Sequence, residues 1–287
     1  MRSPVNSDFK LPELRFVPVE NLVPHEQHDE QRMHPLVERL REQGVLKNPP
    51  IVAPLPGETG DEARYVVLDG ANRSTAVRAA GLPHVLVQVV RYDDPGVELS
   101  TWSHALSQYP RDELEAAIRK IPGVECRAAM RMHARALLAR REALAFVAFE
   151  GAEVLTLHGG KDLPEKNRLL NLIVDLYRQC RRFYRVSNDS IDDARARHPE
   201  VTAVVVFPHF EPVEILELAH SGSRLPAGIT RHLIRWRALR LNIPLERLAD
   251  QGQTLAEKNR WLEDWLKDKV ARSEVRHYEE PTVLFDE

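Results

Sequence analysis

The sequence predicts an α/β or α+β fold, because strand-like and helix-like segments alternate along most of the chain. Short runs rich in β-branched residues, such as residues 85–90, indicate strands. Apolar residues at helical spacing, such as Leu36, Val37 and Leu40, indicate helices, and turns that contain proline or glycine separate the two kinds of segment. With 287 residues and 43% hydrophobic side chains, the chain is long enough for one large or two modest domains.

The first third of the chain predicts a compact α/β unit. A helix is expected around residues 33–40 and ends at Gly44, and a second helix starts near Asn72 and is closed by Gly81. The Asn48-Pro49-Pro50 sequence interrupts regular structure before the next strand. Strands are expected at residues 14–22, 51–53, 65–68 and 85–90.

The remainder of the chain predicts a second α/β unit, so we expect one domain at residues 1–110 and another at residues 111–287. The Glu150-Gly151 pair lies between two apolar runs and predicts a hairpin. Strands are expected at residues 143–149, 153–158 and 202–207, and helices at residues 111–120, 127–141, 163–183, 213–219 and 255–271.

The composition argues against several classes of protein. The formal net charge of −3 argues against a dedicated nucleic-acid binder. An expected helix carries Arg127, Arg131 and Arg135 on one face, and an ordinary solvent-exposed face accounts for this cluster of basic residues. The two cysteines, Cys126 and Cys180, lack the paired spacing of a zinc site or a disulfide framework. Without a secretory signal or a run of about 18 apolar residues, we expect a cytoplasmic protein that does not span a membrane; the oligomeric state is not predicted.

The strongest local signal is the segment Tyr65-Val-Val-Leu-Asp-Gly-Ala-Asn-Arg-Ser-Thr-Ala-Val-Arg-Ala-Ala-Gly81. A buried strand is expected to end at Asp69, Gly70 allows a sharp turn, and a helix follows at once with Asn72, Arg73 and Ser74 in its first turn. The free N–H groups of a helix start and the planar guanidinium of arginine both suit phosphate oxygens. The segment therefore predicts a phosphate site, and the alternative is a plain helix cap at Asp69 with a solvated Arg73.

A second polar cluster, Val23-Pro24-His25-Glu26-Gln27-His28-Asp29, directly follows an expected strand. Its carboxylates and imidazoles suit a general base or metal ligands, because proton abstraction from a hydroxyl needs such a group within hydrogen-bond reach. The spacing alone leaves open a polar loop in which Asp29 caps the next helix.

Two further segments carry side chains suited to a small-molecule pocket. Trp102 and His104 follow the last strand of the first unit, where a tryptophan can form the wall of a pocket or pack in the core. Thr230, Arg231 and His232 follow a glycine-containing turn and could bind a carboxylate or phosphate, or form an ordinary helix start with Thr230 as the cap. The chain lacks a Walker lysine loop, a kinase glycine-rich loop, a GxSxG elbow and an HExxH pair.

Taken together, these motifs resemble the ParB/sulfiredoxin-like superfamily, in which an acidic-Gly-x-x-Arg turn opens a helix and binds nucleotide phosphates. Asp69-Gly70-Ala71-Asn72-Arg73 matches that turn, although Ala71-Asn72 replaces a pair of histidines common there. Within the superfamily the chain is most similar to the free serine kinases, through Pro24-His25-Glu26, Gly44-Val-Leu-Lys-Asn-Pro-Pro50, Trp102-Ser103-His104, Pro226-Ala-Gly-Ile-Thr-Arg-His232 and Asn242-Ile-Pro-Leu245.

The resemblance implies a nucleotide-binding domain at residues 1–110, a second domain at residues 111–287 that completes the substrate pocket, and phosphate transfer from ADP or ATP to free L-serine. It implies Glu26 as the base for the serine hydroxyl and Asp69 as a ligand of Mg²⁺ or a residue that orients this hydroxyl. The phosphates would contact Gly70, Ala71, Asn72 and Arg73, with Ser74 in the same helix turn, and the amino acid would contact Trp102, His104, Thr230, Arg231 and His232.

Two other functions remain as alternatives. A ParB-like, nucleotide-dependent DNA-binding regulator would require a helix-turn-helix after the first unit, and Ile121-Pro122-Gly123-Val124 is a poor connector for one. A sulfiredoxin-type reductase would require a nucleophilic cysteine in the phosphate turn, where this chain has Ala71 and Asn72.

Overall fold

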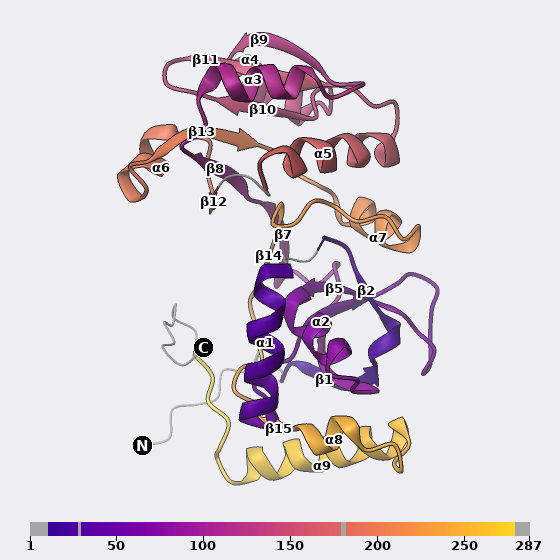
Figure 1. Ribbon diagram of the computed structural model, residues 1–287. Coiled ribbons are helices and arrows are strands. Elements are labelled where there is room, and N and C mark those ends of the chain that lie inside the picture. Colours follow the sequence, from indigo (N-terminus) through magenta and orange to yellow (C-terminus); the bar gives the residue numbers. More distant parts are fainter. Residues whose placement is uncertain (1–10, 28–29, 179–181, 279–287) are drawn as a thin grey trace.

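The chain folds into a mixed α/β structure with two separate sheets, and this confirms the predicted fold class (Figure 1). The computed structural model describes residues 11–27, 30–178 and 182–278. In Figure 1 the two sheets lie at opposite ends of an elongated molecule, and the paired strands β7 and β14 lie between them. Among the described residues, no helix is both long and apolar enough to cross a membrane.

The first sheet has five strands in the order β1-β6-β4-β5-β2 and contains most of the first third of the chain. Its central strands are buried and consist mainly of Val, Ile, Leu and Ala, as is typical of strands covered on both faces. The strands are β1 (Glu13–Pro18), β2 (Leu22–Pro24), β4 (Ile51–Pro54), β5 (Tyr65–Asp69) and β6 (His84–Val89), joined by η1 (Val19–Asn21), α1 (Glu30–Gln43) and α2 (Ala71–Ala79).

The second sheet has six strands in the order β12-β8-β13-β10-β11-β9. The predicted hairpin is present, since β10 and β11 pair antiparallel. The strands are β8 (Ser103–Ser107), β9 (Glu125–Met130), β10 (Ala145–Ala148), β11 (Glu153–His158), β12 (Phe183–Val186) and β13 (Val201–Val206), and the helices are α3 (Arg111–Arg119), α4 (Arg131–Ala139), α5 (Leu163–Arg178), α6 (Ile191–Arg197) and α7 (Pro212–His220).

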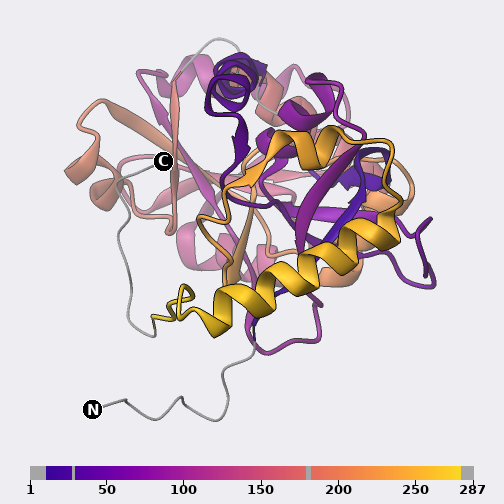
Figure 2. The same cartoon turned by 90° about the horizontal axis from the view of Figure 1, so that it is seen from below.

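After the second sheet the chain returns to the first. Strand β14 (Thr230–Ile234) pairs with β7 (Val97–Thr101), and β15 (Ile243–Pro244) pairs with β3 (Val45–Leu46) before helices α8 (Leu245–Ala249) and α9 (Leu255–Ala271). Figure 2 shows α9 running across the underside of the molecule, beneath the first sheet.

The C-terminal helices complete the core of the first sheet. The side chains of Leu248 and Leu262 are buried in the same cluster as Phe16, and the Asn259 side chain accepts a hydrogen bond from the Phe16 N–H at 2.8 Å. The division after residue 110 remains a prediction, and the packing adds that the chain beyond β15 contributes to the first unit.

Two helix predictions are wrong in part. Residues 127–130 lie in β9, which pairs along six residues with β11, so Arg127 does not share a helix face with Arg131 and Arg135. The predicted helix at residues 163–183 ends at Arg178, and Phe183 begins a strand that pairs with β8. In both places hydrogen bonding to a distant strand outweighs the local preference for a helix. Cys180 lies outside the described residues.

Candidate active site

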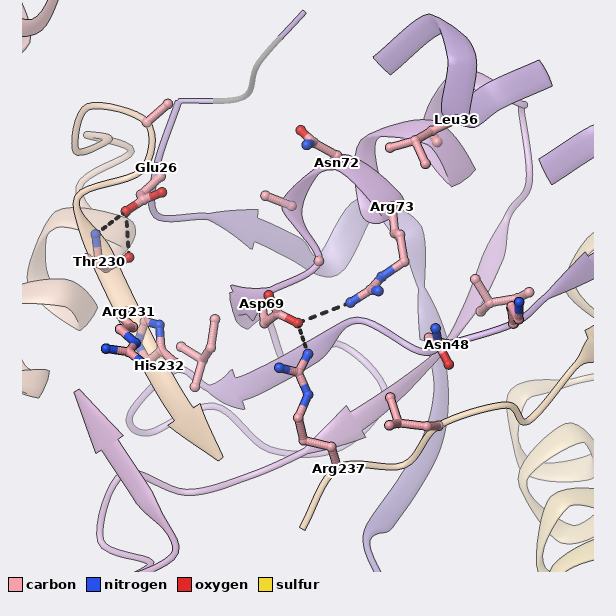
Figure 3. Close-up of a pocket in the computed structure, with 18 of the residues that line it drawn as sticks. Glu26, Leu36, Asn48, Asp69, Asn72, Arg73, Thr230, Arg231, His232 and Arg237 are labelled. Atoms are coloured by element: carbon pink, nitrogen blue, oxygen red, sulfur yellow. Dashed lines mark hydrogen bonds and ion pairs between the residues drawn. The ribbon is translucent and has the colours of Figure 1, made fainter. Parts of the chain in front are cut away.

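A cavity of about 940 Å³ brings together most of the predicted site residues (Figure 3). Its lining comes from α1, the turn between β5 and α2, the end of β2, and β14 with the turn before it. The predicted residues that line it are Glu26, Asp69, Gly70, Ala71, Asn72, Arg73, Trp102, Thr230, Arg231 and His232.

The turn from Asp69 to Arg73, here called the Asp69 turn, has the predicted conformation. Strand β5 ends at Asp69, and Gly70 has a φ of 85°, in the left-handed region that glycine adopts readily. Helix α2 then begins at Ala71, so its first N–H groups lie at the cavity. The resulting helix start at the cavity has the form of an anion site.

Two arginines bind the carboxylate of Asp69 in this structure (Figure 3). The Arg73 guanidinium lies 3.1 Å from Asp69 Oδ2, and Arg237 reaches the same oxygen from the segment after β14. Burial raises the pKa of Asp69, but the charges of Arg237 and Arg73 outweigh burial, and the pKa is lowered overall. Asp69 is therefore ionised at neutral pH.

Ser74 is buried beneath the Asp69 turn, and it is not among the residues that line the cavity. Its hydroxyl donates to the Ala71 carbonyl at 2.9 Å. The side chain therefore stabilises the first turn of α2, and a phosphate contact by Ser74 remains only a prediction.

We expect Gly70→Ala to weaken nucleotide binding by about tenfold or more, with a smaller effect on L-serine. A Cβ at this position would lie 2.9 Å from Arg73 Nη2 and 3.1 Å from Pro50 Cα, and the positive φ adds backbone strain. The dissociation constant of ATP, measured by calorimetry, tests this expectation. Gly57→Ala is the matched control, because Gly57 also has a positive φ but a Cβ there meets nothing within 4 Å. Equal affinities of the two variants would contradict the role assigned to the Asp69 turn.

Glu26 is held by a pairing between two segments that are far apart in the sequence. Residues 25–27 run beside Leu225, with hydrogen bonds from Leu225 N to His25 O and from Gln27 N to Leu225 O, both 2.8 Å long. This pairing sets the Glu26 carboxylate against the turn before β14. The carboxylate accepts hydrogen bonds from Gly228 N at 2.8 Å, Thr230 N at 2.6 Å and Thr230 Oγ1 at 2.5 Å.

The remaining wall of the cavity carries an aromatic and a cationic group. The Arg231 guanidinium lies 4.3 Å from the centre of the Trp102 ring, a cation–π contact that orients the arginine. His232 shares a 2.8 Å hydrogen bond with the Tyr92 hydroxyl. Burial, together with the nearby His25, lowers the pKa of His232 to about 3, so this imidazole is neutral at physiological pH.

His104 lies away from the cavity lining, contrary to the contact with the amino acid that the resemblance implies. Its side chain is fully buried, and its ring nitrogens contact the Tyr177 hydroxyl at 2.7 Å and the Gly228 carbonyl at 3.0 Å. Burial lowers the pKa of His104 to about 3. His104 therefore fixes the turn that holds Glu26, because Gly228 N is one of the donors to that carboxylate.

The structure adds lining residues that sequence reasoning missed. Arg237 has the most direct role, because it binds Asp69 across a separation of 168 residues. No local pattern marks it, since it lies in an irregular segment beside Trp236. The other basic and amide side chains in the lining are Gln27, Arg39, Gln43, Lys47, Asn48 and Arg185. His28 and Asp29, from the second polar cluster, lie outside the described residues.

The lining has many more cationic than anionic side chains, which suits an anionic ligand such as a nucleotide. Asp69 and Glu26 are its carboxylates, and the cations are Arg39, Lys47, Arg73, Arg185, Arg231 and Arg237. Among the described residues, no group of three or more His, Cys, Asp or Glu side chains gathers as a metal site would require.

Comparison with known proteins confirms the resemblance. The chain is 25% identical over 280 residues to the ATP-dependent L-serine kinase SbnI of Staphylococcus aureus, covering 96% of this chain and 97% of that protein. It is 36% identical over 91 residues to an ATP-dependent L-serine kinase of Staphylothermus marinus, a match that covers 32% of this chain and 34% of that protein. No family model matches the chain.

Solved structures share the fold. A free serine kinase with a glutamate-to-glutamine substitution, in complex with AMP, superposes with a TM-score of 0.69 at 20% identity, covering 86% of this chain and 98% of that one. C-terminally truncated SbnI from Staphylococcus aureus superposes with a TM-score of 0.68 at 23% identity, covering 90% of this chain and 97% of that one. Each superposition covers more than four fifths of this chain, so the shared fold extends over most of its length.

Proposed function

We propose that this chain, which has the fold of the free serine kinases, transfers a phosphate from ATP or ADP to the hydroxyl of free L-serine and forms O-phospho-L-serine. The observation that carries the proposal is that one cavity holds both the Asp69 turn, with its arginines, and the Glu26 carboxylate. Phosphoryl transfer needs positioning and charge neutralisation more than covalent help from the protein. The cavity offers both, together with a base.

At the donor end, the Asp69 turn would bind the phosphates of the nucleotide. The N–H groups at the start of α2 and the guanidinium of Arg73 offer hydrogen bonds to phosphate oxygens. Arg237, in the segment after β14, would add a second guanidinium. Ala71 provides its backbone N–H, so the missing histidine of the family turn removes only a side-chain contact.

At the acceptor end, Glu26 would take the proton of the serine hydroxyl as the oxygen attacks phosphorus. An ionised carboxylate has about four lone-pair sites. Three are occupied by the donors of Gly228 and Thr230, which leaves one on Oε2 for the substrate proton. Arg231, oriented by Trp102, would bind the carboxylate of the amino acid, and neutral His232 would contact a polar group of it.

The Asp69 turn also fits Mg²⁺, which usually binds one or two carboxylates together with substrate phosphates and water. Asp69 provides one ionised carboxylate beside the amides expected to bind phosphate. The ion would neutralise charge on the transferred phosphate. Arg73 and Arg237, which pair with Asp69 in this structure, would then be released to bind phosphate oxygens.

The described residues give no support to the alternative of a DNA-binding regulator. Helices α3 and α4 are separated by β9, a strand of the second sheet, so they do not form a helix-turn-helix. The net charge of −3 likewise gives no general attraction to phosphate backbones.

Incubation of the purified protein with Mg²⁺, ATP or ADP, and single amino acids tests the proposal. Mass spectrometry should detect O-phosphoserine with L-serine and no phosphorylated product with L-alanine, which lacks the hydroxyl. Parallel reactions with L-homoserine and L-threonine define the acceptor range, and the two nucleotides define the donor. Failure to phosphorylate any hydroxyl amino acid, by protein that binds the nucleotide, would refute the proposal.

A further inference from the structure

His25 precedes Glu26 in the chain and contacts Thr230, so it belongs to the hydrogen-bond network that holds Glu26, the proposed base. The imidazole is buried, with 4% of its surface exposed. Its Nδ1 lies 2.5 Å from the Val67 carbonyl oxygen, and its Nε2 lies 2.7 Å from Thr230 Oγ1. Thr230 Oγ1 in turn lies 2.5 Å from Glu26 Oε1. A continuous chain of hydrogen bonds therefore connects β5, His25, Thr230 and the proposed base.

The number of hydrogens in this chain is limited by chemistry. A carbonyl oxygen only accepts, so Nδ1 of His25 must carry a hydrogen. The Thr230 hydroxyl has a single hydrogen and cannot donate it to both His25 and Glu26. When Glu26 is ionised it can only accept, so Thr230 donates to Glu26 and Nε2 of His25 must also carry a hydrogen. His25 is then an imidazolium.

A second arrangement satisfies the same contacts. If His25 is neutral, Thr230 donates to Nε2, and Glu26 must be protonated to donate to Thr230 Oγ1. Both arrangements hold one mobile proton, which lies either on His25 or on Glu26 and moves through the Thr230 hydroxyl. Only the arrangement with the proton on His25 leaves Glu26 able to act as a base.

We propose that His25 is a positioning residue that retains this shared proton through Thr230 and so keeps Glu26 ionised and correctly oriented. The inference rests on the proposed function, in which Glu26 accepts the proton of the acceptor hydroxyl. In that step the O–H bond of the substrate breaks, its proton moves to Oε2 of Glu26, and the oxygen forms a bond to phosphorus as the nucleotide oxygen leaves. The proton on His25 stays in place and maintains the donor that holds Oε1.

Two backbone donors at the Glu26 carboxylate complement the arrangement in which the shared proton lies on His25. The N–H groups of Gly228 and Thr230 both donate to the Glu26 carboxylate and so stabilise its negative charge. Burial lowers the pKa of His25 overall, although the charge of Glu26 and the Val67 carbonyl oppose this effect, so the imidazolium depends on the hydrogen bonds to Val67 and Thr230. The other titratable ring that faces His25 is His232, whose centroid lies 5.3 Å away and whose lowered pKa leaves it neutral.

Nitrogen NMR of the nucleotide-free protein labelled with ¹⁵N-histidine tests the proton location without any activity measurement. The chain has 12 histidines, and loss of one signal in His25→Gln assigns the resonances of His25. At pH 7 we expect hydrogens on both ring nitrogens in the wild type, and a neutral ring with hydrogen on Nδ1 only in Glu26→Gln. A neutral His25 in the wild type, or an imidazolium that persists in Glu26→Gln, would overturn the proposal.

Kinetic variants test the positioning role in the enzyme itself. The amide of glutamine can replace the Nε2 donor to Thr230 without a charge, whereas that of asparagine can replace only the Nδ1 donor to Val67. We expect His25→Asn to lower kcat by about tenfold or more with little change in the KM of ATP, and His25→Gln to lose less. Thr230→Val should lose about as much as His25→Asn, and Thr230→Ser, which keeps the hydroxyl, should recover most of that loss.

The double variant His25→Asn/Thr230→Val completes the test, because residues that act through one network give non-additive effects. We expect the kcat of the double variant to equal that of whichever single variant has the lower kcat. Multiplied losses in the double variant, or equal activities of His25→Asn and His25→Gln at matched folding by circular dichroism, would contradict the network. A wild type that forms no O-phosphoserine would instead refute the proposed function, and the NMR result would remain interpretable.

Discussion

Glu26→Gln is expected to lower kcat for L-serine by about 100-fold or more, with a modest change in the KM of either substrate. Glutamine has nearly the same shape, and its amide oxygen can accept from Gly228 N while its amide nitrogen donates to Thr230 Oγ1, so the turn before β14 should keep most of its contacts. Its amide nitrogen, however, cannot take up a proton from the serine hydroxyl. The loss should therefore fall on the chemical step, and initial rates measured over a range of both substrates will show it.

Glu98→Gln is the matched control for this experiment. Glu98 lies on β7, which pairs with β14, and its side chain is exposed and outside the cavity lining. Glu98→Gln removes the same charge as Glu26→Gln but outside the cavity, so the kcat of this variant should equal that of the wild type. Wild-type turnover in Glu26→Gln would remove Glu26 from the mechanism, whatever its position in the cavity.

Asp69→Asn is expected to have the second large effect, a loss of about 100-fold in kcat/KM for the nucleotide, reduced in part by high Mg²⁺. The substitution removes the ionised carboxylate that would bind the ion, and it also leaves Arg73 and Arg237 without their shared partner. Initial rates measured at Mg²⁺ concentrations from micromolar to tens of millimolar test this expectation directly.

Asp93→Asn provides the control, because Asp93 is an exposed carboxylate that pairs with Arg91 on the surface. It should show the Mg²⁺ dependence of the wild type. If Asp69→Asn also shows an unchanged Mg²⁺ dependence and nucleotide affinity, Asp69 does not bind the metal. Its ion pairs with the two arginines would then be its main role.

Local sequence signals predicted the elements that are determined by short-range interactions. Helix α9 has the predicted bounds because Thr254 and Glu257 form a capping box and an apolar face packs on the first sheet. The Asp69 turn was likewise predictable, since a strand, a glycine with positive φ and a helix start follow one another directly.

The errors occur where long-range pairing determines the structure. The segment containing Arg127 is rich in helix-forming residues, yet it forms an edge strand because β11 provides a partner along its whole length. The turn before β14 was ambiguous between a pocket wall and a helix start, and its pairing with β7 resolves the ambiguity in favour of a strand at Thr230. Local patterns in a single sequence do not show which distant strands pair with each other.

In the site, too, local motifs were predictable and long-range contacts were not. Glu26 and Asp69 were found because each follows a strand within a recognisable motif. Arg237 was missed because its partnership with Asp69 depends on the return of the chain to the first sheet after β14. His104 was placed at the substrate through its neighbour Trp102, but Trp102 lies between β7 and β8, whereas His104 lies within β8 and its ring is buried in the core.

The central claim is that the Asp69 turn binds the nucleotide phosphates while Glu26 faces the acceptor hydroxyl in the same cavity. A crystal structure of Glu26→Gln with Mg²⁺, a nucleotide and L-serine tests it most directly. We predict the terminal phosphate on the amides of residues 70–73 and the serine hydroxyl at about 2.6–3.2 Å from the side chain at position 26. Phosphates bound away from α2, or a serine hydroxyl turned away from position 26, would contradict the account.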